Sequence, residues 1–343
     1  MKYSFPQTFF PPPAFLAMRA AGIAISESDI TLINLFSTRR GIDVASFESW
    51  SLPDGSISDG SVAAPELVQE ALRHFHVKEN VGFARIAIPE AASYLVRLLV
   101  PVGTDAAIRA YLTEHLEEHV PLRPENALFD YIIISVLENT ADILLSVASR
   151  QVVDSYLGSF AGTNIIPLSV EIDIQAIARA VVPAYETDAV AIVDIGRFRT
   201  IIAIVADGFV RFATTTDIGS IHVESAHQVK EKKNADVAQK RMEALRAFGE
   251  ELGAEVDRHL LYWKTHRKGD EERDLERIIV SGTEMAEPDV FDHIVHYLPL
   301  HPTLANPWQN VLFRGRKIPP MTRRESFKYT TAIGLALSSF SRE

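Results

Sequence analysis

Apolar and polar positions alternate along the chain with two periods, one typical of strands and one typical of helices. Near the N-terminus, three apolar stretches predict three consecutive strands within residues 19–50, and a loop rich in Gly, Ser and Asp follows at 53–61. Residues 64–76 then show helical spacing, with these apolar side chains on one side: Leu67, Ala71, Leu72 and Phe75. Strands followed by a helix indicate the beginning of an α/β architecture.

Residues 81–162 form a distinct block with the pattern β-β-α-β-β-α. Its predicted elements are strands at 83–88 and 94–100, a helix capped by Thr104 and running to about His119, strands at 129–137 and 141–148, and a helix near 150–161. We expect this block to be a small α+β subdomain inserted into a larger domain.

After this block the chain returns to alternating strands and helices. The predicted elements are a strand at 164–172, a helix at 172–182, three strands within 190–216, a long helix over 235–264, a strand at 275–280, a helix near 287–297, a Pro-rich loop at 299–322 and a closing helix at 326–340. Two halves of alternating strands and helices, with one inserted unit, predict an α/β fold.

Residues 190–205, VAIVDIGRFRTIIAIV, predict two strands joined by a short turn at Asp194 and Gly196. Backbone N–H groups at such a turn can approach an anion, and an Asp at the end of a strand can hold a metal ion through water. Thr200 either donates its hydroxyl nearby or fills a strand position. We expect half of a nucleotide site here, with an ordinary Asp-Gly turn as the alternative.

A similar strand-turn-strand pattern occurs near the N-terminus, which suggests two similar halves that face each other across a cleft. Superposing the two stretches places Ala24 at the position of Asp194, Ser26 at that of Gly196 and Ile30 at that of Thr200. The first copy therefore has no carboxylate where the second copy has one.

Three other motifs each allow a structural as well as a functional interpretation. In VSGTEMAEP (280–288), Gly282 ends a strand before a helix, a junction that can bring the backbone near an adenine or a phosphate but is common in itself. His115–His119 spells H-x-x-E-H, yet no suitable third zinc ligand follows, so a solvated helix end is favoured over a metal site. The basic residues at 314–324 favour a solvated loop over contact with anionic lipid or an acidic partner.

Composition excludes several classes of function. The 343 residues suffice for about two domains, and the net charge of −11 argues against nucleic-acid binding. The absence of cysteine excludes disulfides, thiolate catalysis and Cys-type zinc sites. No stretch is apolar for long enough to span a membrane, and residues 1–18 predict a Pro-rich arm or a partner-docking segment rather than a signal peptide. Cytoplasm is the expected location.

The order of several motifs resembles one family. These are AGIAISESDITL, IPEAASYLVRLLVP, FDYIIISVL, VDIGRFRT, DIGS, EVDRHLLYW, VSG, ANPW and AIGLAL, which together span residues 19–340. The chain resembles the PilM family, the actin-like cytoplasmic proteins of type IV pilus assembly and relatives of the cell-division protein FtsA.

This resemblance implies an actin-like (ribonuclease H-like) fold with two facing domains, a nucleotide cleft for ATP and Mg²⁺, and an inserted small α+β subdomain. The implied divisions are an arm (1–18), a first domain in two parts (19–80 and 163–185), the inserted subdomain (81–162), a second domain (186–325) and a closing helix (326–343). It also implies a partner, the cytoplasmic N-terminal peptide of a PilN-type bitopic membrane protein, together with other pilus assembly components. The protein would then be peripheral to the inner membrane through its partners.

The resemblance also implies cofactor-binding residues. Asp194, Gly196 and Thr200 would belong to the second phosphate loop, and Gly282 to the adenosine loop. Glu255 and Arg258 would approach the ribose or the base. The last two candidates come from the hairpin turns: Ser26 and Arg197. No catalytic or metal-ligating residue is predicted.

Departures from the family pattern fall on this same site. Ala24 replaces an Asp, Thr31 replaces a Lys, and Thr283-Glu284 follows Gly282 where a second glycine is usual. Arg197 and Arg199 either grip phosphate or fill the cleft. Loss of a carboxylate and a cation would weaken Mg-nucleotide binding by roughly 10² or more. We therefore expect a scaffold with a degenerate cleft, with a working ATPase switch as the main alternative and a sugar-kinase-type enzyme as a weaker one.

Overall fold

The computed structural model describes residues 20–38, 41–186, 188–221, 235–266, 275–311 and 321–340. Its first sheet has five strands in the order β10-β6-β1-β2-β3. In that order the strands are Ile166–Ile172, Phe83–Ile88, Ala21–Ile25, Asp29–Thr38 and Gly41–Ser51. The hairpin β1–β2 and strand β3 are antiparallel neighbours, whereas β1, β6 and β10 run parallel.

The second sheet repeats this topology in the order β13-β12-β11-β14-β15. In that order its strands are Phe209–Thr216, Thr200–Ala206, Ala189–Ile195, Leu275–Ser281 and His301–Leu304. Here too a hairpin (β11–β12) has a third antiparallel strand on one side and two parallel strands on the other. The expected repeat of two similar halves is confirmed by this equivalence.

Two helices connect the halves. Helix α5 (Asp173–Val181) contacts strands of both large sheets, and α10 (Thr330–Leu337) lies on the first sheet and packs along α5. The helices approach closely at Gly334, where a Cβ atom would lie 1.8 Å from the carbonyl oxygen of Ala176. Apolar side chains of both sheets, α5 and α10 form one continuous core.

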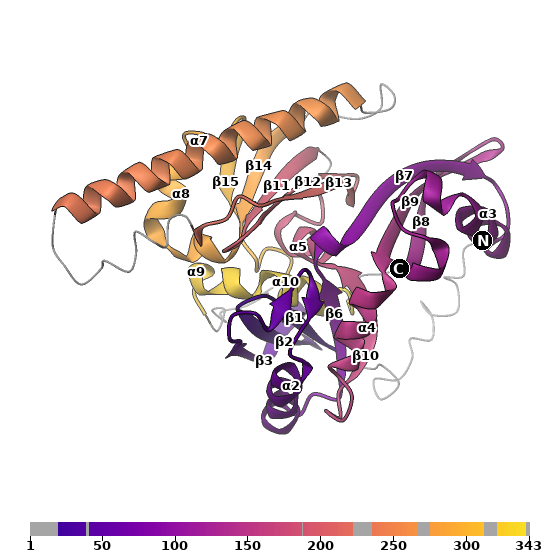
Figure 1. The fold of residues 1–343 in the computed structure, drawn as a ribbon, viewed down its shortest axis with the longest axis horizontal. Coiled ribbons are helices and arrows are strands. Elements are labelled where there is room, and N and C mark those ends of the chain that lie inside the picture. The colour runs from indigo at the N-terminus through magenta and orange to yellow at the C-terminus, as the bar shows by residue number, and fades with distance from the viewer. Residues whose placement is uncertain are drawn as a thin grey trace.

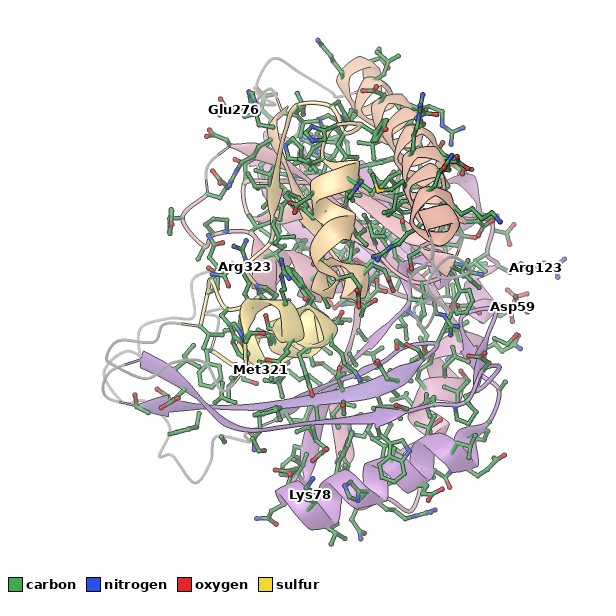
Figure 2. The ribbon with its side chains drawn as sticks, turned by 90° about the vertical axis from the view of Figure 1, so that its left-hand side faces the viewer. Asp59, Lys78, Arg123, Glu276, Met321 and Arg323 are labelled. Atoms are coloured by element: carbon green, nitrogen blue, oxygen red, sulfur yellow. The ribbon has the colours of Figure 1, made fainter. Side chains whose placement is uncertain are left out.

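The outer faces of the two sheets carry their own helices (Figure 1). Helices α2 (Pro65–Glu79) and α4 (Arg150–Gly158) cover the first sheet, with the two-stranded β4–β5 (Ile57–Ser58 and Ser61–Val62) beside them. The long α7 (Ala235–His266) and the short α8 (Pro288–Ile294) cover the second sheet. In Figure 2 the C-terminal helices, near Met321 and Arg323, lie between the first sheet below and α7 above.

The inserted unit is a three-stranded sheet in the order β7-β9-β8 with one helix on it. Its elements are β7 (Ser93–Pro101), α3 (Asp105–His115), β8 (Ala127–Leu137) and β9 (Thr140–Ser149), and they enclose a small separate core. The Thr104 hydroxyl accepts a hydrogen bond from the Ala107 amide at 3.3 Å, which confirms the predicted helix cap.

The sequence prediction was wrong about which strands this unit contains. Strand β6 was expected to belong to it, but β6 lies in the first large sheet between β1 and β10. Helix α4 also turns toward the first sheet, where Val152, Val153 and Tyr156 join the core. Adjacent apolar strands such as β6 and β7 carry no local signal of which sheet each will join. The domain limits expected from the sequence stay a prediction.

Two further differences lie in the C-terminal region. The predicted Pro-rich loop contains strand β15, in which Pro302 is tolerated because the strand is at the sheet edge. The predicted closing helix is three consecutive segments, α9 (Arg323–Ser326), the 3₁₀ turn η5 (Phe327–Tyr329) and α10. The N-terminal arm and most of the basic cluster lie outside the described residues.

Two negative findings hold for the described part of the chain. None of its helices is long and apolar enough to cross a membrane. No group of three His, Asp or Glu side chains within it is placed to hold a metal ion. His115, from the H-x-x-E-H motif, instead places its Nδ1 atom 2.9 Å from the carbonyl oxygen of Tyr111.

We predict that Gly334→Ala lowers the free energy of unfolding by about 1–3 kcal/mol, because the added methyl group would overlap the backbone of α5. Chemical denaturation of the two proteins measures this difference. Gly158→Ala is the matched control, because no atom lies within 4 Å of the position that its Cβ would take, and it should leave stability unchanged or slightly raised. Equal stability of the two variants would contradict the close contact.

Candidate functional site

A cavity of about 220 Å³ lies between the two hairpins. Both turns are built alike, because the Ser26 amide donates to the Asp29 carbonyl at 2.8 Å and the Gly196 amide donates to the Arg199 carbonyl at 2.9 Å. Strand pairing also agrees, since Ala24 opposes Thr31 as Asp194 opposes Ile201. The predicted equivalence of Ala24 with Asp194 is confirmed by this register. We call this space the cleft cavity.

Asp194 contributes a carboxyl group to the cleft cavity from the end of β11. It lies opposite Ser281 in the neighbouring strand β14. Burial raises the pKa of Asp194 to about 6, and the Ser281 hydroxyl partly offsets this rise. The carboxyl group is therefore partly protonated just below neutral pH.

A second, partly buried carboxyl group, that of Asp173, faces the cleft cavity from the first residue of α5. Burial raises the pKa of Asp173 to about 8, and the charges of Glu90 and Asp194 add to the effect. Its Oδ1 accepts hydrogen bonds from the amides of Glu90 at 3.0 Å and Ile174 at 2.6 Å. Sequence reasoning missed Asp173 and Glu90, because an acidic residue at a helix start is common.

Two polar contacts join the halves across the cleft. The Thr215 hydroxyl, on β13, donates to the carboxylate of Glu90, and Arg197 in the second hairpin turn lies 3.3 Å from Asp54 of the first half. Burial raises the pKa of Glu90, and the Thr215 hydroxyl lowers it in part. These contacts link the two halves at the cleft.

The first hairpin turn is satisfied by its own side chains. The Ser26 hydroxyl oxygen lies 3.1 Å from the Asp29 amide, which donates to it, and the hydroxyl donates to the Asp29 carboxylate at 3.0 Å. Lys328, from the C-terminal segment, lies 3.4 Å from the same carboxylate. A phosphate would have to break these bonds to reach the turn amides.

The structure brings together five of the eight predicted site residues. The cleft cavity is lined by Ser26, Asp194, Gly196, Arg197 and Gly282. Gly282 has φ +110°, and a Cβ there would lie 2.1 Å from the carbonyl oxygen of Ile195, so packing alone already requires glycine.

The other three predicted residues do not line the cleft cavity. Thr200 is buried, and its hydroxyl donates to the Ile218 carbonyl at 2.7 Å, so it fills a strand position. Glu255 pairs with Arg258 and His259 along α7. The predicted role of the α7 residues at a ribose or base finds no support in this placement.

The two hairpins present different groups to the cleft cavity. The second hairpin offers Asp194 and a turn that begins at Gly196, whereas the first offers Ala24 and a turn in which the Ser26 hydroxyl accepts from the Asp29 amide. Arg197 and Arg199 both line the cavity, with Arg199 lying 3.6 Å from Asp217. The whole lining holds five acidic side chains and three basic ones: Glu27, Asp29, Glu90, Asp173 and Asp194, and Arg197, Arg199 and Lys328.

A larger groove of about 1110 Å³ lies on the other side of α5, between the inserted sheet and the first sheet. We call it the groove. Its walls come from β8 and β9, from β10 and α5, and from the turn at Asp207 and Gly208. Both β8 and β10 are sheet edges, so the groove is bordered by two strands without a second partner among the described residues.

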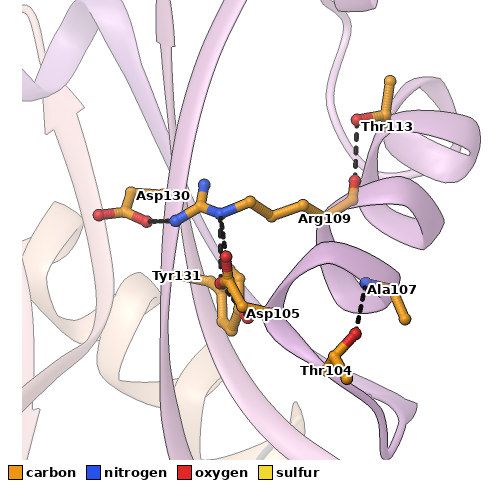
Figure 3. Close-up of polar contacts among 7 residues, drawn as sticks. All are labelled: Thr104, Asp105, Ala107, Arg109, Thr113, Asp130 and Tyr131. Atoms are coloured by element: carbon orange, nitrogen blue, oxygen red, sulfur yellow. Dashed lines mark hydrogen bonds and ion pairs between the residues drawn. The ribbon is translucent and has the colours of Figure 1, made fainter.

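The β8 wall of the groove is braced from behind by α3 (Figure 3). Arg109 on α3 donates to Asp130 at 2.7 Å and to Asp105 at 3.1 Å, and the Tyr131 hydroxyl donates to Asp105 at 2.7 Å. Burial, with Asp105 adding to it, raises the pKa of Tyr131 to about 12. Asp130 and Tyr131 both line the groove, so this network fixes its wall.

Comparison with known proteins assigns the family. The family described as "Type IV pilus assembly protein PilM" matches residues 22–340 of the chain. The chain belongs to the PilM family. No curated protein matches it significantly.

Solved structures agree with this PilM-family assignment in their fold. A structure described as "PilM-PilN type IV pilus biogenesis complex" aligns with a TM-score of 0.78 and 16% identity, over 95% of this chain and 100% of that chain. The ethanolamine utilization protein EutJ from Carboxydothermus hydrogenoformans aligns with a TM-score of 0.53 and 16% identity, over 93% and 89%. The predicted actin-like α/β fold with two sheet-containing lobes is confirmed.

We predict that Asp173→Asn changes how the stability of this PilM-family protein depends on pH. An unfolded Asp titrates near 3.9, while burial raises the pKa of Asp173 to about 8, so the folded state favours the protonated form. The stability that this protonation provides is present below about pH 4 and is lost as the pH rises to about 8. Asn keeps an acceptor for the two amides but does not ionise.

The free energy of unfolding of the Asn variant, relative to the parent protein, should therefore increase between pH 5 and pH 8 by at most about 1.4 kcal/mol per pH unit. Urea denaturation at several pH values measures it. Asp257→Asn, on the exposed face of α7, is the control, and its free energy of unfolding should depend on pH as that of the parent protein does. A difference for Asp173→Asn that does not vary with pH would refute the assignment.

Proposed function

We propose that this chain is a cytoplasmic scaffold of a type IV pilus or a related envelope assembly system. It binds the cytoplasmic N-terminal peptide of a PilN-type membrane protein in the groove, and through that partner it sits at the inner membrane. Membership of the PilM family supports the setting. The observation that carries the proposal is the groove itself, bordered by two strand edges.

The shape of the groove suits an extended peptide. An exposed strand edge offers main-chain donors and acceptors that an added strand can pair with. Ile132 on β8 and the opposing Leu144 on β9 both line the groove, which gives its wall an apolar surface. The neighbouring Ile133 opposes Ile143, which belongs to the core of the inserted unit, and it does not line the groove.

Acidic residues are frequent in the lining of the groove, and most of them are paired within the protein. They are Asp130, Glu171, Glu186, Asp188 and Asp207, of which Asp130 pairs with Arg109, Glu186 with Arg277 and Asp207 with Arg211. Glu171 pairs in turn with Arg179, a basic residue of the lining, at 2.7 Å.

The cleft supports a scaffold rather than an ATPase. In a hydrolytic site of two like halves, both hairpins place metal ion and water, and here Ala24 stands where the second hairpin has Asp194. The alternative is a Mg-ATP switch that opens the cleft by breaking the Arg197–Asp54 and Thr215–Glu90 contacts. That alternative requires turnover, which the scaffold does not.

We predict that Ile132→Asp weakens binding of the PilN-type peptide at least about tenfold, because a charge would replace an apolar wall position of the groove. Fluorescence anisotropy with a labelled peptide of the partner's cytoplasmic N-terminus measures the Kd. Ile133→Asp is the matched control on the same strand and should change the Kd less than about twofold.

An equal loss of peptide affinity in both variants would indicate that the substitutions damage the inserted unit and do not remove a contact in the groove. Absence of binding by the parent protein, with a scrambled peptide giving the same signal, would overturn the proposed function.

A further inference from the structure

The arm at residues 1–18, MKYSFPQTFFPPPAFLAM, has no role in the function proposed above. Its one charged side chain is that of Lys2, and it has phenylalanine at positions 5, 9, 10 and 15. Proline stands at positions 6 and 11–13, and sequences of this kind favour the extended polyproline II conformation. A segment so rich in phenylalanine gains free energy when an apolar surface covers these rings.

The groove has the lining that such a segment requires. Aromatic side chains contribute to it from three parts of the fold, namely Phe129 and Tyr131 on β8, Phe209 on β13 and Phe340 just after α10. Aromatic-lined grooves bind proline-rich segments well, because such segments are already extended and lose little entropy on binding. Four of the five acidic lining residues are paired with arginines, so the groove suits an arm that is nearly uncharged.

The described part of the chain begins beside the groove. The first residues of β1 pair with β6, where the Arg85 guanidinium donates to the hydroxyls of Ser339 and Ser169 at 3.1 Å each. The residues that follow these serines, Phe340 and Val170, both line the groove. Strand β10 is two places from β1 in the sheet, a separation of about 10 Å, whereas an extended arm spans up to about 60 Å. The arm is therefore long enough to reach the groove from its point of attachment.

We propose that residues 1–18 bind in the groove of their own chain and compete there with the partner peptide. The arm is then an intramolecular inhibitor that the partner must displace. The competition rests on the proposed function, because it takes the groove to be the partner's site. The binding of the arm in the groove does not rest on it.

The covalent connection makes even a weakly binding arm an effective competitor. A short flexible connection holds a tethered segment at an effective concentration of about 1 mM. An arm with an intrinsic Kd of about 0.1 mM would then fill about nine-tenths of the grooves and raise the apparent Kd of the partner peptide about tenfold.

Photo-cross-linking in the full chain tests where the arm binds. Phe10 is replaced by p-benzoylphenylalanine, and mass spectrometry after irradiation identifies the residues to which it becomes joined. We expect links within one chain to the lining of the groove. Ile132→Asp should lower their yield to about half, the fall that a tenfold loss of arm affinity gives at these concentrations. Ile133→Asp, outside the lining, is the matched control and should leave the yield unchanged.

Two results would contradict this position of the arm. Links to other parts of the chain, or a yield that Ile132→Asp does not change, would overturn binding in the groove. Links between two chains would show that the groove receives the arm of a second copy, which would overturn the intramolecular inhibition.

Fluorescence anisotropy with the labelled partner peptide tests the competition. Phe9→Asp together with Phe10→Asp should lower the Kd of the peptide about tenfold, because an arm without these rings would leave the groove free. Gln7→Asp together with Thr8→Asp is the matched control, since it adds the same charge to the same segment and keeps the rings. It should change the Kd less than about twofold.

Equal Kd values for the parent and both arm variants, or equal falls in the two variants, would overturn the competition. Absence of peptide binding by all three proteins would overturn the proposed function and the competition with it. The cross-links still decide in that case whether the arm occupies the groove.

Discussion

The close contact between α5 and α10 is the constraint on which the rest of this structure depends. The backbone of α10 meets the carbonyl of Ala176 at Gly334, and Gly22 of β1 allows an equally close approach to Ala332 on the opposite side of α10. Three elements are thereby stacked with no side chain between them at these points. Because β1 begins the first hairpin and α5 contacts the second sheet, this stacking fixes how the two hairpins face each other.

Much of the fold could be predicted from local patterns. The wrong predictions concerned which strands pair with one another in a sheet. Short-range spacing and turn residues are enough to predict the hairpins, the helix cap at Thr104 and the long helix α7. Strand β6 was assigned to the wrong sheet because parallel neighbours are joined by distant segments, and β15 was missed because four residues with a proline resemble a loop. Such features depend on contacts that no single stretch of sequence contains.

The same distinction explains the candidate site. Asp194 was found because it stands at a turn that repeats, whereas Asp173, Glu90 and Lys328 come from a helix start, a 3₁₀ turn and the C-terminal segment and meet only in three dimensions. Glu255 and Arg258 were expected only from the family resemblance, and here they pair with each other, while Thr200 fills a strand position, one of the two roles that its pattern predicted. The two hairpins share one backbone geometry and differ in their polar groups: the second carries the Asp194 carboxyl group, and the first has the Ser26 hydroxyl bonded to Asp29.

Helix α5 is a wall common to the cleft and the groove. Asp173 and Ile177 face the cleft cavity, while Gln175, Ala178 and Arg179 face the groove, all within a helix of nine residues. A helix of nine residues moves as one body. A ligand that displaces it on one side therefore changes the shape of the site on the other side. Because linkage is reciprocal, a peptide in the groove would change the affinity of the cleft for its ligand by the same factor by which that ligand changes the affinity of the groove for the peptide. Ligands of the cleft and of the groove would therefore be coupled through one shared helix.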